Sequence, residues 1–377
     1  MIYLDHAATT PMRPDAVAAM EPFLRATFGN PSGVHGISRD AKNALEAARE
    51  EAATLIGASR PLEIVFTGGG TEADNLAVVG AALSSARGGV VTAAVEHAAV
   101  LESARFVGRM GRDVSFIGVD GHGRLDPVEV ADAVGEDTAV VSIMAANNET
   151  GVRQPVTKIA AAARSVAPQV VVHTDAVQAF ISEPITVAAT GADLISLAAH
   201  KFGGPKGVGI LYVRDGVELE AVIHGGGQEL GRRSGTHNVA GVVGMVAAMR
   251  GAVAERQTFH DRVGAIRDGF EEDLRSGIPD LEINAPVDDR LVQHAHVRIP
   301  GMDAETLLVR LDQAGVAGAA GSACHSGAIE VSHVLTAMGM SGVAAAECVR
   351  FSFGWSSTPD EAAEAARLVV EVVGTLR

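Results

Sequence analysis

The chain has 377 residues, of which 47% are apolar and 4% aromatic, so it can bury a substantial core built mainly on Ala, Val, Leu and Ile. Its 30 Lys and Arg against 46 Asp and Glu give a net charge of −16, which argues against nucleic acid or an anionic membrane as the main partner. Asp5 stands where a signal peptide would be basic, and two cysteines cannot form a disulfide framework. We therefore expect a reduced, cytoplasmic protein that is too long for one ordinary domain.

Apolar runs of strand length alternate with segments of helical periodicity over the first 250 residues. The expected strands are Glu63–Thr67, Val90–Ala93, Val114–Ile117, Ala139–Ala145, Val170–Thr174, Leu194–Leu197 and Val208–Val213. The expected helices are Asp40–Ile56, Glu72–Ala86, His97–Gly108, Pro127–Val134 and Val156–Val166. This alternation predicts an α/β fold with a mostly parallel sheet that is covered by helices on both faces.

Near residue 250 the pattern changes to long helices with strand-like pieces between them. The helices are expected at Val253–Leu274 and Pro359–Leu376, and the strands at His296–Ile299 and Arg350–Phe353. We expect a large α/β domain over residues 14–250 and a smaller α+β domain made of residues 1–13 and 251–377. The apolar run at residues 239–249 is too short to span a bilayer and is expected to be a buried helix.

The most informative candidate site is the pair His200 and Lys201, which follows an apolar run and precedes a turn rich in Gly and Pro. A lysine at the end of a buried strand is partly desolvated, which disfavours the ammonium form and makes the amine nucleophilic. Such a lysine can form a Schiff base, and pyridoxal phosphate is the usual cofactor for that chemistry. Taken alone, a solvated surface lysine is the competing interpretation.

Three consecutive glycines at residues 68–70 follow one expected strand and precede a helix. Their backbone N–H groups can crowd toward a ligand, and Thr71 can cap the helix while its hydroxyl binds a phosphate oxygen. The pattern is neither the GxGxxG dinucleotide fingerprint nor a P-loop. It favours a phosphate-binding turn, with a plain flexible turn as the alternative.

Polar residues end three other expected strands. Asp175 is expected at the carboxyl edge of the sheet, where it could pair with a protonated pyridine nitrogen. Asn147 could hydrogen-bond a ring hydroxyl oxygen, and His97 could stack on a ring or move protons. Helix capping or turn formation is the alternative for each of them.

The two cysteines lie in different surroundings. Cys324 is flanked by small residues, which suits a reactive thiol, whereas Cys348 lies in an apolar element typical of a structural cysteine. The histidines show no metal-ligand spacing such as HExxH, so no metal site is expected.

Together these segments resemble the class V aminotransferase superfamily and, within it, the NifS/IscS-type cysteine desulfurases. The resemblance covers essentially the whole chain in order, with motifs at residues 3–11, 28–32, 70–75, 96–97, 147–149, 175–178, 200–201, 224–229, 233–236, 321–324 and 349–352. It implies the pyridoxal-phosphate-dependent fold type I, which is aspartate-aminotransferase-like. It also implies a homodimer with shared active sites.

The resemblance assigns the reaction to five residues. Lys201 would form the Schiff base and move the Cα proton, Asp175 would pair with the ring nitrogen, and His97 would stack on the ring. Arg350 would bind the substrate carboxylate as a bidentate pair, and Cys324 would be the nucleophile that takes the sulfur.

The resemblance also implies a set of binding residues. Those expected at the phosphate are Gly70, Thr71, His200 and, from a second subunit, Thr236. Those expected near the ring oxygen are Asn147, which would also touch the substrate, and Gln178. Ala198 stands where the family usually has a phosphate-binding serine, so we expect binding to weaken by about 0.5–1.5 kcal/mol. Trp355 is a second departure, with no functional interpretation from the sequence.

The sequence therefore predicts a cysteine desulfurase that converts L-cysteine into L-alanine and leaves a persulfide on Cys324 for a sulfur-acceptor protein. That acceptor could serve iron–sulfur cluster assembly or another thiolation. A selenocysteine lyase or a class V aminotransferase would use the same cofactor, although an aminotransferase needs no thiol. A non-catalytic partner subunit is a further alternative, which the intact Lys201, Asp175, Arg350 and Cys324 argue against.

Overall fold

The computed structural model describes residues 1–321 and 331–377 and is built around a seven-stranded sheet. The strand order is β2-β8-β7-β6-β5-β3-β4. Their bounds are β2 (Ile64–Thr67), β3 (Gly89–Ala93), β4 (Val114–Ile117), β5 (Thr138–Ser142), β6 (Val171–Asp175), β7 (Leu194–Ala198) and β8 (Gly209–Val213). From β7 to β4 every pair is parallel, while β8 runs antiparallel to both of its neighbours. The prediction of a mostly parallel α/β sheet is confirmed.

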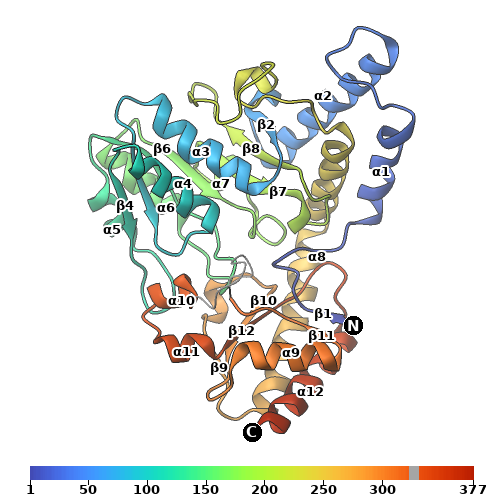
Figure 1. Ribbon diagram of the computed structural model, residues 1–377, viewed down its shortest axis with the longest axis vertical. Helices are drawn as coiled ribbons and strands as arrows, with labels where there is room; N and C mark the ends of the chain where they lie inside the picture. The colour runs from blue at the N-terminus through green and yellow to red at the C-terminus, as the bar shows by residue number, and fades with distance from the viewer. Residues whose placement is uncertain (322–330) are drawn as a thin grey trace.

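Alternating residues of the sheet strands enter two separate apolar cores, one on each face. In β2, for example, Val65 belongs to one core and Ile64 and Phe66 to the other. The first core is completed by α3 (Gly70–Ser84) and α4 (Ala98–Arg109), and the second by α2 (Gly36–Ile56), α6 (Val156–Val166) and α8 (Val239–Gly277). Both faces of the sheet are therefore covered, as Figure 1 shows.

The remaining helices are short or lie at the periphery. They are α1 (Pro14–Arg25), α5 (Pro127–Ala133), α7 (Val187–Thr190), α9 (Ala304–Ala314), α10 (His333–Ala337), α11 (Gly342–Ala346) and α12 (Pro359–Leu376). In the described residues no helix combines the length and the apolar character that crossing a membrane requires.

Two small sheets occupy the lower part of the molecule in Figure 1. One has the order β12-β10-β9 and is antiparallel, with β9 (Glu282–Ile283), β10 (His294–Arg298) and β12 (Cys348–Ser352). In the other, β1 (Ile2–Tyr3) pairs in parallel with β11 (Val316–Ala317). The first residues of the chain thus pair with strands from its C-terminal part.

Helix α8 passes from the upper part of the molecule to the lower one as a continuous helix. Its neighbours include α1 and α2 in the upper part of the molecule and α12 and β10 in the lower part. The division that we expected at residue 250 falls inside this helix, so the pattern change there marks where its environment changes. The helix that we expected to start at Val253 begins at Val239 instead.

Candidate active site

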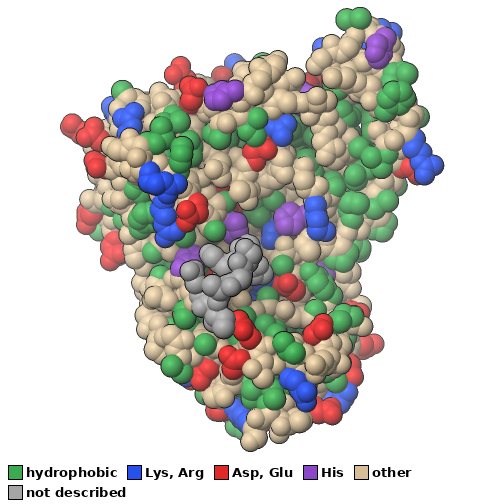
Figure 2. Space-filling model, viewed as in Figure 1, with side chains coloured by type: hydrophobic (Ala, Val, Ile, Leu, Met, Phe, Trp, Pro, Cys, Tyr) green, Lys and Arg blue, Asp and Glu red, His purple; other side chains and the backbone are tan. Residues whose placement is uncertain are grey.

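A cavity of about 400 Å³ lies beyond the carboxyl ends of β6 and β7. Most of the residues that the sequence predicted for the site line it, although they come from distant parts of the chain. This position is where open α/β sheets generally bind ligands. In Figure 2 histidine side chains gather where the upper and lower parts of the molecule meet.

One end of the cavity is formed by the glycine-rich turn before α3. Gly69 has φ of 146° and precedes the helix without a side-chain cap. The first residue of the helix, Gly70, borders the cavity. A Cβ on Gly70 would lie 3.1 Å from Val177 and 3.3 Å from the Cβ of Ala198. A Cβ on Gly209 would lie 2.8 Å from the carbonyl carbon of Gly69. Close approach of the backbone thus requires glycine at residue 209 and leaves little room for a side chain at residue 70, and the helix terminus favours an anion.

Thr71 and His200 border the same end of the cavity. His200 Nδ1 lies 3.2 Å from the hydroxyl of Thr9. Burial lowers the pKa of His200 to about 4, so its imidazole is neutral at pH 7 and can donate one hydrogen bond. Beyond Thr71 and His200 the cavity adjoins a wider hollow of about 720 Å³, lined also by Val222 and Ile223.

Asp175 lies at the end of β6 with its carboxylate in the cavity wall, where Oδ1 accepts a hydrogen bond from the Val177 N–H at 2.9 Å. Behind it lies Asp74, whose Oδ1 has no hydrogen-bond partner among the described residues. The carboxylates of Asp74 and Asp175 and a ring nitrogen of His97 lie within 4.8 Å of one another. Burial raises the pKa of Asp175, and burial together with the charge of Asp175 raises that of Asp74 well above its usual value. A cation facing Asp175 would stabilise its charged form.

His97 is held by the start of α4, where its Nδ1 accepts a hydrogen bond from the Ala99 N–H at 3.1 Å. Burial lowers the pKa of His97, so the ring is neutral at pH 7 and its other nitrogen carries the proton. Asp74, Asp175 and His97 have donor types that a metal ion could also use, but Asp175 and His97 are the residues expected to hold a pyridine ring.

Lys201 lies in a short turn directly after β7 and borders the cavity. Its Nζ donates hydrogen bonds to the carbonyl oxygens of Ala7 and Ala8 at 2.5 and 2.9 Å. Gln178 Nε2 donates to the same Ala7 oxygen at 2.9 Å. The N-terminal segment therefore forms the wall of the cavity next to the amine.

Trp355 has a structural role that the sequence did not reveal. Its indole N–H donates to the carbonyl of Pro11 at 3.0 Å, and the guanidinium of Arg13 lies 5.4 Å from its ring centre. The side chain thus fastens the N-terminal segment that covers Lys201.

Arg350 enters the cavity from β12, on the opposite side from the large sheet. Its Nη2 is 2.7 Å from Asp5 Oδ1, and Nη1 donates to the Asn148 carbonyl at 2.8 Å. Its Nε is buried without a partner among the described residues. A buried guanidinium at the cavity wall can bind a carboxylate.

Asn147 does not line this cavity. Its Nδ2 donates to the Val95 carbonyl at 3.0 Å, and its Oδ1 accepts from the N–H groups of Glu149 and Thr150 at 2.8 and 3.0 Å. The asparagine that borders the cavity is Asn148, which our sequence reasoning passed over. Asp5 and Asp74 were also missed, and their proximity to Arg350 and Asp175 is visible only in the fold.

Thr236 and the two cysteines complete the predicted set. Thr236 is exposed and borders neither the cavity nor the adjoining hollow. Cys324 lies outside the described residues. Cys348 is buried, and burial raises the pKa of its thiol to about 11, which confirms the prediction of a structural cysteine.

Comparisons with known proteins match nearly the whole chain. The family model for class V aminotransferases matches residues 2–364. A protein of Dictyoglomus turgidum named cysteine desulfurase IscS is 41% identical over 96% of this chain and 91% of its own length. A solved structure of a NifS-like protein superposes with a TM-score of 0.93 at 34% identity over 99% of both chains. A structure described as SspA in complex with cysteine has a TM-score of 0.81 at 33% identity, covering 94% of this chain and 99% of that one.

Proposed function

This chain belongs to the class V aminotransferase family, and from that premise we propose that it is a pyridoxal-phosphate-dependent cysteine desulfurase. It would convert L-cysteine into L-alanine and pass the sulfur onward as a persulfide. The similarity to proteins named cysteine desulfurase over nearly the full chain supports this function. The observation that carries it is the cavity that gathers Lys201, Asp175 and Arg350 beside a helix N-terminus.

The residues around the cavity fit pyridoxal phosphate. A dianionic phosphate suits the start of α3, where glycine leaves room for close approach and Thr71 and His200 offer donors. A protonated pyridine nitrogen suits Asp175, because a cation in contact with this buried carboxylate would offset the burial that raises its pKa. Bound there, the cofactor would supply an aldehyde that condenses with amines and a ring that accepts the electron pair left at the substrate Cα.

We assign the binding of the amino acid to the opposite wall. Arg350 would bind its carboxylate with two parallel N–H donors and so orient the Cα–H bond toward Lys201. The Lys201 amine would then take that proton and return it, a role that requires the neutral amine. The neutral His97 would lie against the ring face, and Gln178 and Asn148 would offer amide groups near the ring oxygen. Asn147 would act behind them by holding the turn.

We propose that Cys324 performs the sulfur transfer. Its thiolate would attack the sulfur of the substrate, so that an S–S bond forms while the substrate C–S bond breaks. The electron pair of that bond stays on carbon, which takes up protons and becomes the methyl group of alanine. The products are L-alanine and a persulfide on Cys324, with no external reductant consumed. Because this thiol must remain reduced, we propose the cytoplasm as its compartment.

Two partners belong to the proposal. One is a second copy of the chain, which would supply Thr236 to the phosphate site, since Thr236 is exposed and does not border its own cavity. The other is a sulfur-acceptor protein, either an iron–sulfur scaffold or a thiolating enzyme, that would remove the persulfide.

The proposal is tested by measuring alanine release from L-cysteine with a dithiol reductant present, together with the absorbance spectrum before and after borohydride reduction. We expect turnover, a visible band that disappears on reduction, and a reduced adduct on the peptide containing Lys201. Cys324→Ser should keep the visible band and release no alanine, whereas Cys348→Ser serves as the control cysteine and should keep turnover. Rapid alanine release by Cys324→Ser, or an adduct on another residue, would contradict the assignment.

A further inference from the structure

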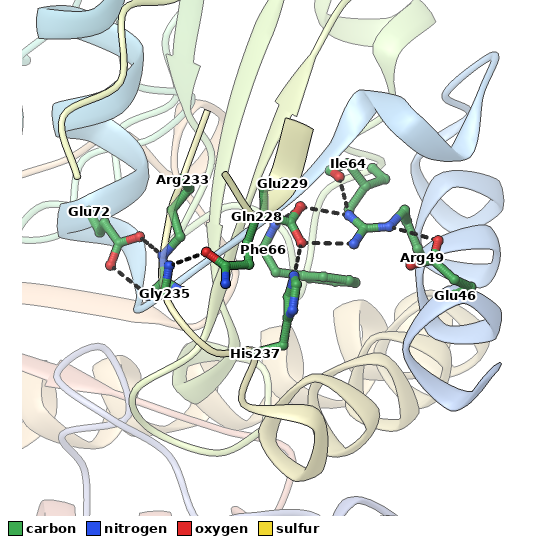
Figure 3. A network of polar contacts seen from close by, with 10 residues as sticks. All are labelled: Glu46, Arg49, Ile64, Phe66, Glu72, Gln228, Glu229, Arg233, Gly235 and His237. Carbon is green, nitrogen blue, oxygen red and sulfur yellow. Dashed lines mark hydrogen bonds and ion pairs between the residues drawn. The ribbon is translucent and has the colours of Figure 1, made fainter. Parts of the chain in front are cut away.

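A cluster of buried polar side chains lies outside the cavity, where residues 228–237 meet α2 and β2 (Figure 3). Glu229 lies at its centre and is 8% exposed. Arg49 Nη1 and Nη2 donate to its two oxygens at 2.7 and 2.8 Å, and His237 Nε2 lies 2.6 Å from Oε1. Burial alone would raise the pKa of Glu229, but the hydrogen bonds from His237 and Arg49 lower it to about 2. We refer to Arg49, Glu229 and His237 as the Arg49–Glu229–His237 cluster.

This cluster fastens residues 228–237 to the open edge of the large sheet. Strand β2 is the last strand on that side, so its outward backbone groups have no neighbouring strand among the described residues. Arg49 Nη1 donates to the Ile64 carbonyl at 2.6 Å, and the Phe66 N–H donates to Glu229 at 3.1 Å. The ion pair thus satisfies the backbone donor and acceptor that another strand would bind.

A second contact fastens the same segment at the beginning of α3. Arg233 Nε is 2.7 Å from Glu72 Oε1, and Glu72 Oε2 accepts a hydrogen bond from the Gly68 N–H at 2.9 Å. Within the segment, the Gly235 N–H donates to Gln228 Oε1 at 2.8 Å. In the sequence Thr236 lies between Gly235 and His237, and Figure 3 shows the contacts of both of these neighbours.

The segment adopts a backbone conformation that is unfavourable without such support. Glu229 and Leu230 have φ of 51° and 58°, in the left-handed region that non-glycine residues avoid, and they are the two non-glycine residues with positive φ in the described chain. Such conformations persist where the surrounding contacts hold them. The four hydrogen bonds to Glu229 supply those contacts at the position itself.

We propose that the Arg49–Glu229–His237 cluster positions Thr236 for the active site of the other subunit. The proposal rests on the proposed function, which places the Thr236 hydroxyl at the partner's cofactor phosphate. Thr236 is exposed beside the fastened residues and borders neither the cavity nor the 720 Å³ hollow of its own chain. Glu229 is therefore a positioning residue that acts in trans.

Binding measurements separate positioning from a general loss of structure. Apo protein is titrated with pyridoxal phosphate and with pyridoxal, which lacks the phosphate, and the dissociation constants are read from absorbance. We expect Glu229→Gln to weaken pyridoxal phosphate binding by about tenfold or more and to leave pyridoxal binding unchanged within about twofold. His237→Gln, at the margin of the cluster, should show the same selective loss to a smaller degree.

A matched control uses another ion pair of α2. Glu51 lies on α2, the helix that carries Arg49, and pairs with Arg250 at 2.5 Å on the surface. Glu51→Gln therefore removes a carboxylate from α2 without changing the contacts of residues 228–237. We expect its two dissociation constants to equal those of the wild type. Size-exclusion chromatography checks that every variant is dimeric.

Mixed dimers test whether the cluster acts in trans. Lys201→Ala subunits are combined with Glu229→Gln subunits, and the mixed species is isolated by two different affinity tags. One of its two sites then has an intact Lys201 and receives Thr236 from a subunit with intact Glu229. We expect that site to bind pyridoxal phosphate with wild-type affinity and to restore about half of the wild-type alanine release.

Each outcome decides between the proposals. Equal weakening of both ligands, loss of the dimer in Glu229→Gln and His237→Gln alike, or mixed dimers without a high-affinity site would overturn the positioning role and leave the proposed function intact. Wild-type protein that binds neither pyridoxal phosphate nor pyridoxal would overturn the proposed function and this inference with it.

Discussion

The cavity and the Arg49–Glu229–His237 cluster both bury carboxyl groups, and their surroundings shift the pKa values of those groups in opposite directions. In the cavity, burial raises the pKa of Asp175 and, together with the charge of Asp175, that of Asp74. In the Arg49–Glu229–His237 cluster, the hydrogen bonds to Glu229 outweigh burial and lower its pKa to about 2. In the cluster, Arg49 and His237 already bind the oxygens of Glu229. In the cavity, a bound cation would further stabilise the charged form of Asp175. The interactions of the cluster therefore stabilise the fold, whereas the buried carboxylates of the cavity favour the binding of a cationic ligand.

The largest expected effect is on chemistry in the cavity. Lys201→Ala should lower kcat/KM for alanine release from L-cysteine by at least about a thousandfold, because the amine both holds the cofactor and moves the proton. Lys42→Ala, an exposed lysine on α2, is the control and should retain full activity. Residual turnover above one tenth of the wild-type rate would contradict the role of Lys201.

The same chemical change should have opposite effects on stability in the two regions. Glu229→Gln should lower the free energy of unfolding by about 3 kcal/mol, because it leaves the buried Arg49 guanidinium without its anion. Asp175→Asn should raise the stability of the apo protein, because it removes a carboxylate whose charged form is destabilised by burial. Urea unfolding of the apo variants at pH 7 gives both values.

The contrast depends on the sign as well as the size of the two changes. If both amide variants were destabilised equally, the inference that burial destabilises the charged form of Asp175 in the apo protein would be wrong. Asp175→Asn should in addition lose most alanine release while gaining stability, since the cofactor ring would lack its anionic partner.

Acid should weaken the cluster over a defined range of pH. The pKa of Glu229 is lowered from 4.5 to about 2, so its contribution to stability is fully present above pH 4.5 and is lost as the pH falls toward 2. Between pH 5 and pH 3 the wild type should lose about 2 kcal/mol more than Glu229→Gln. Parallel curves of unfolding free energy against pH for the two proteins would refute this.

The smallest expected effect concerns the phosphate end of the cavity. Ala198→Ser would add a hydroxyl at a buried position that borders the cavity next to Gly70. We expect pyridoxal phosphate to bind about 0.5–1.5 kcal/mol more tightly, as measured by titration of the apo protein. Pyridoxal, which has no phosphate, is the control ligand, and its affinity should not change.

Much of the fold could be predicted from the sequence because most strands of the large sheet are buried along their whole length. The half-buried strand Val114–Ile117 and the helix Val156–Val166 also have the predicted bounds. The two-residue strands β1 and β11 could not be predicted, because only their pairing with each other defines them. Helix α8 was predicted in two pieces, because its pattern changes when it leaves the large sheet for the small one.

The site residues that belong to sequence motifs could be predicted. Those that reach the cavity only through the way the chain folds could not. Lys201 and Asp175 were recognised by residue type and position and Arg350 through the family resemblance, and all three border one cavity. Which of two adjacent asparagines borders it depends on how the turn after Asn147 folds. Arg49 had a signal that we did not use, since it lies between Leu45, Ala48 and Ala52 on the apolar side of α2.

The contact between Asp5 and Arg350 has a consequence for ligand selection. Before any amino acid arrives, the guanidinium of Arg350 already has an internal anion at 2.7 Å, so the charge of this side chain is balanced within the chain. An incoming carboxylate must exchange with Asp5 or bind beside it. An amine without a carboxylate, such as cysteamine, would leave that ion pair undisturbed and gain nothing from it. Arg350 would thus favour ligands that carry a carboxylate over simple thiols, which have none to bind it.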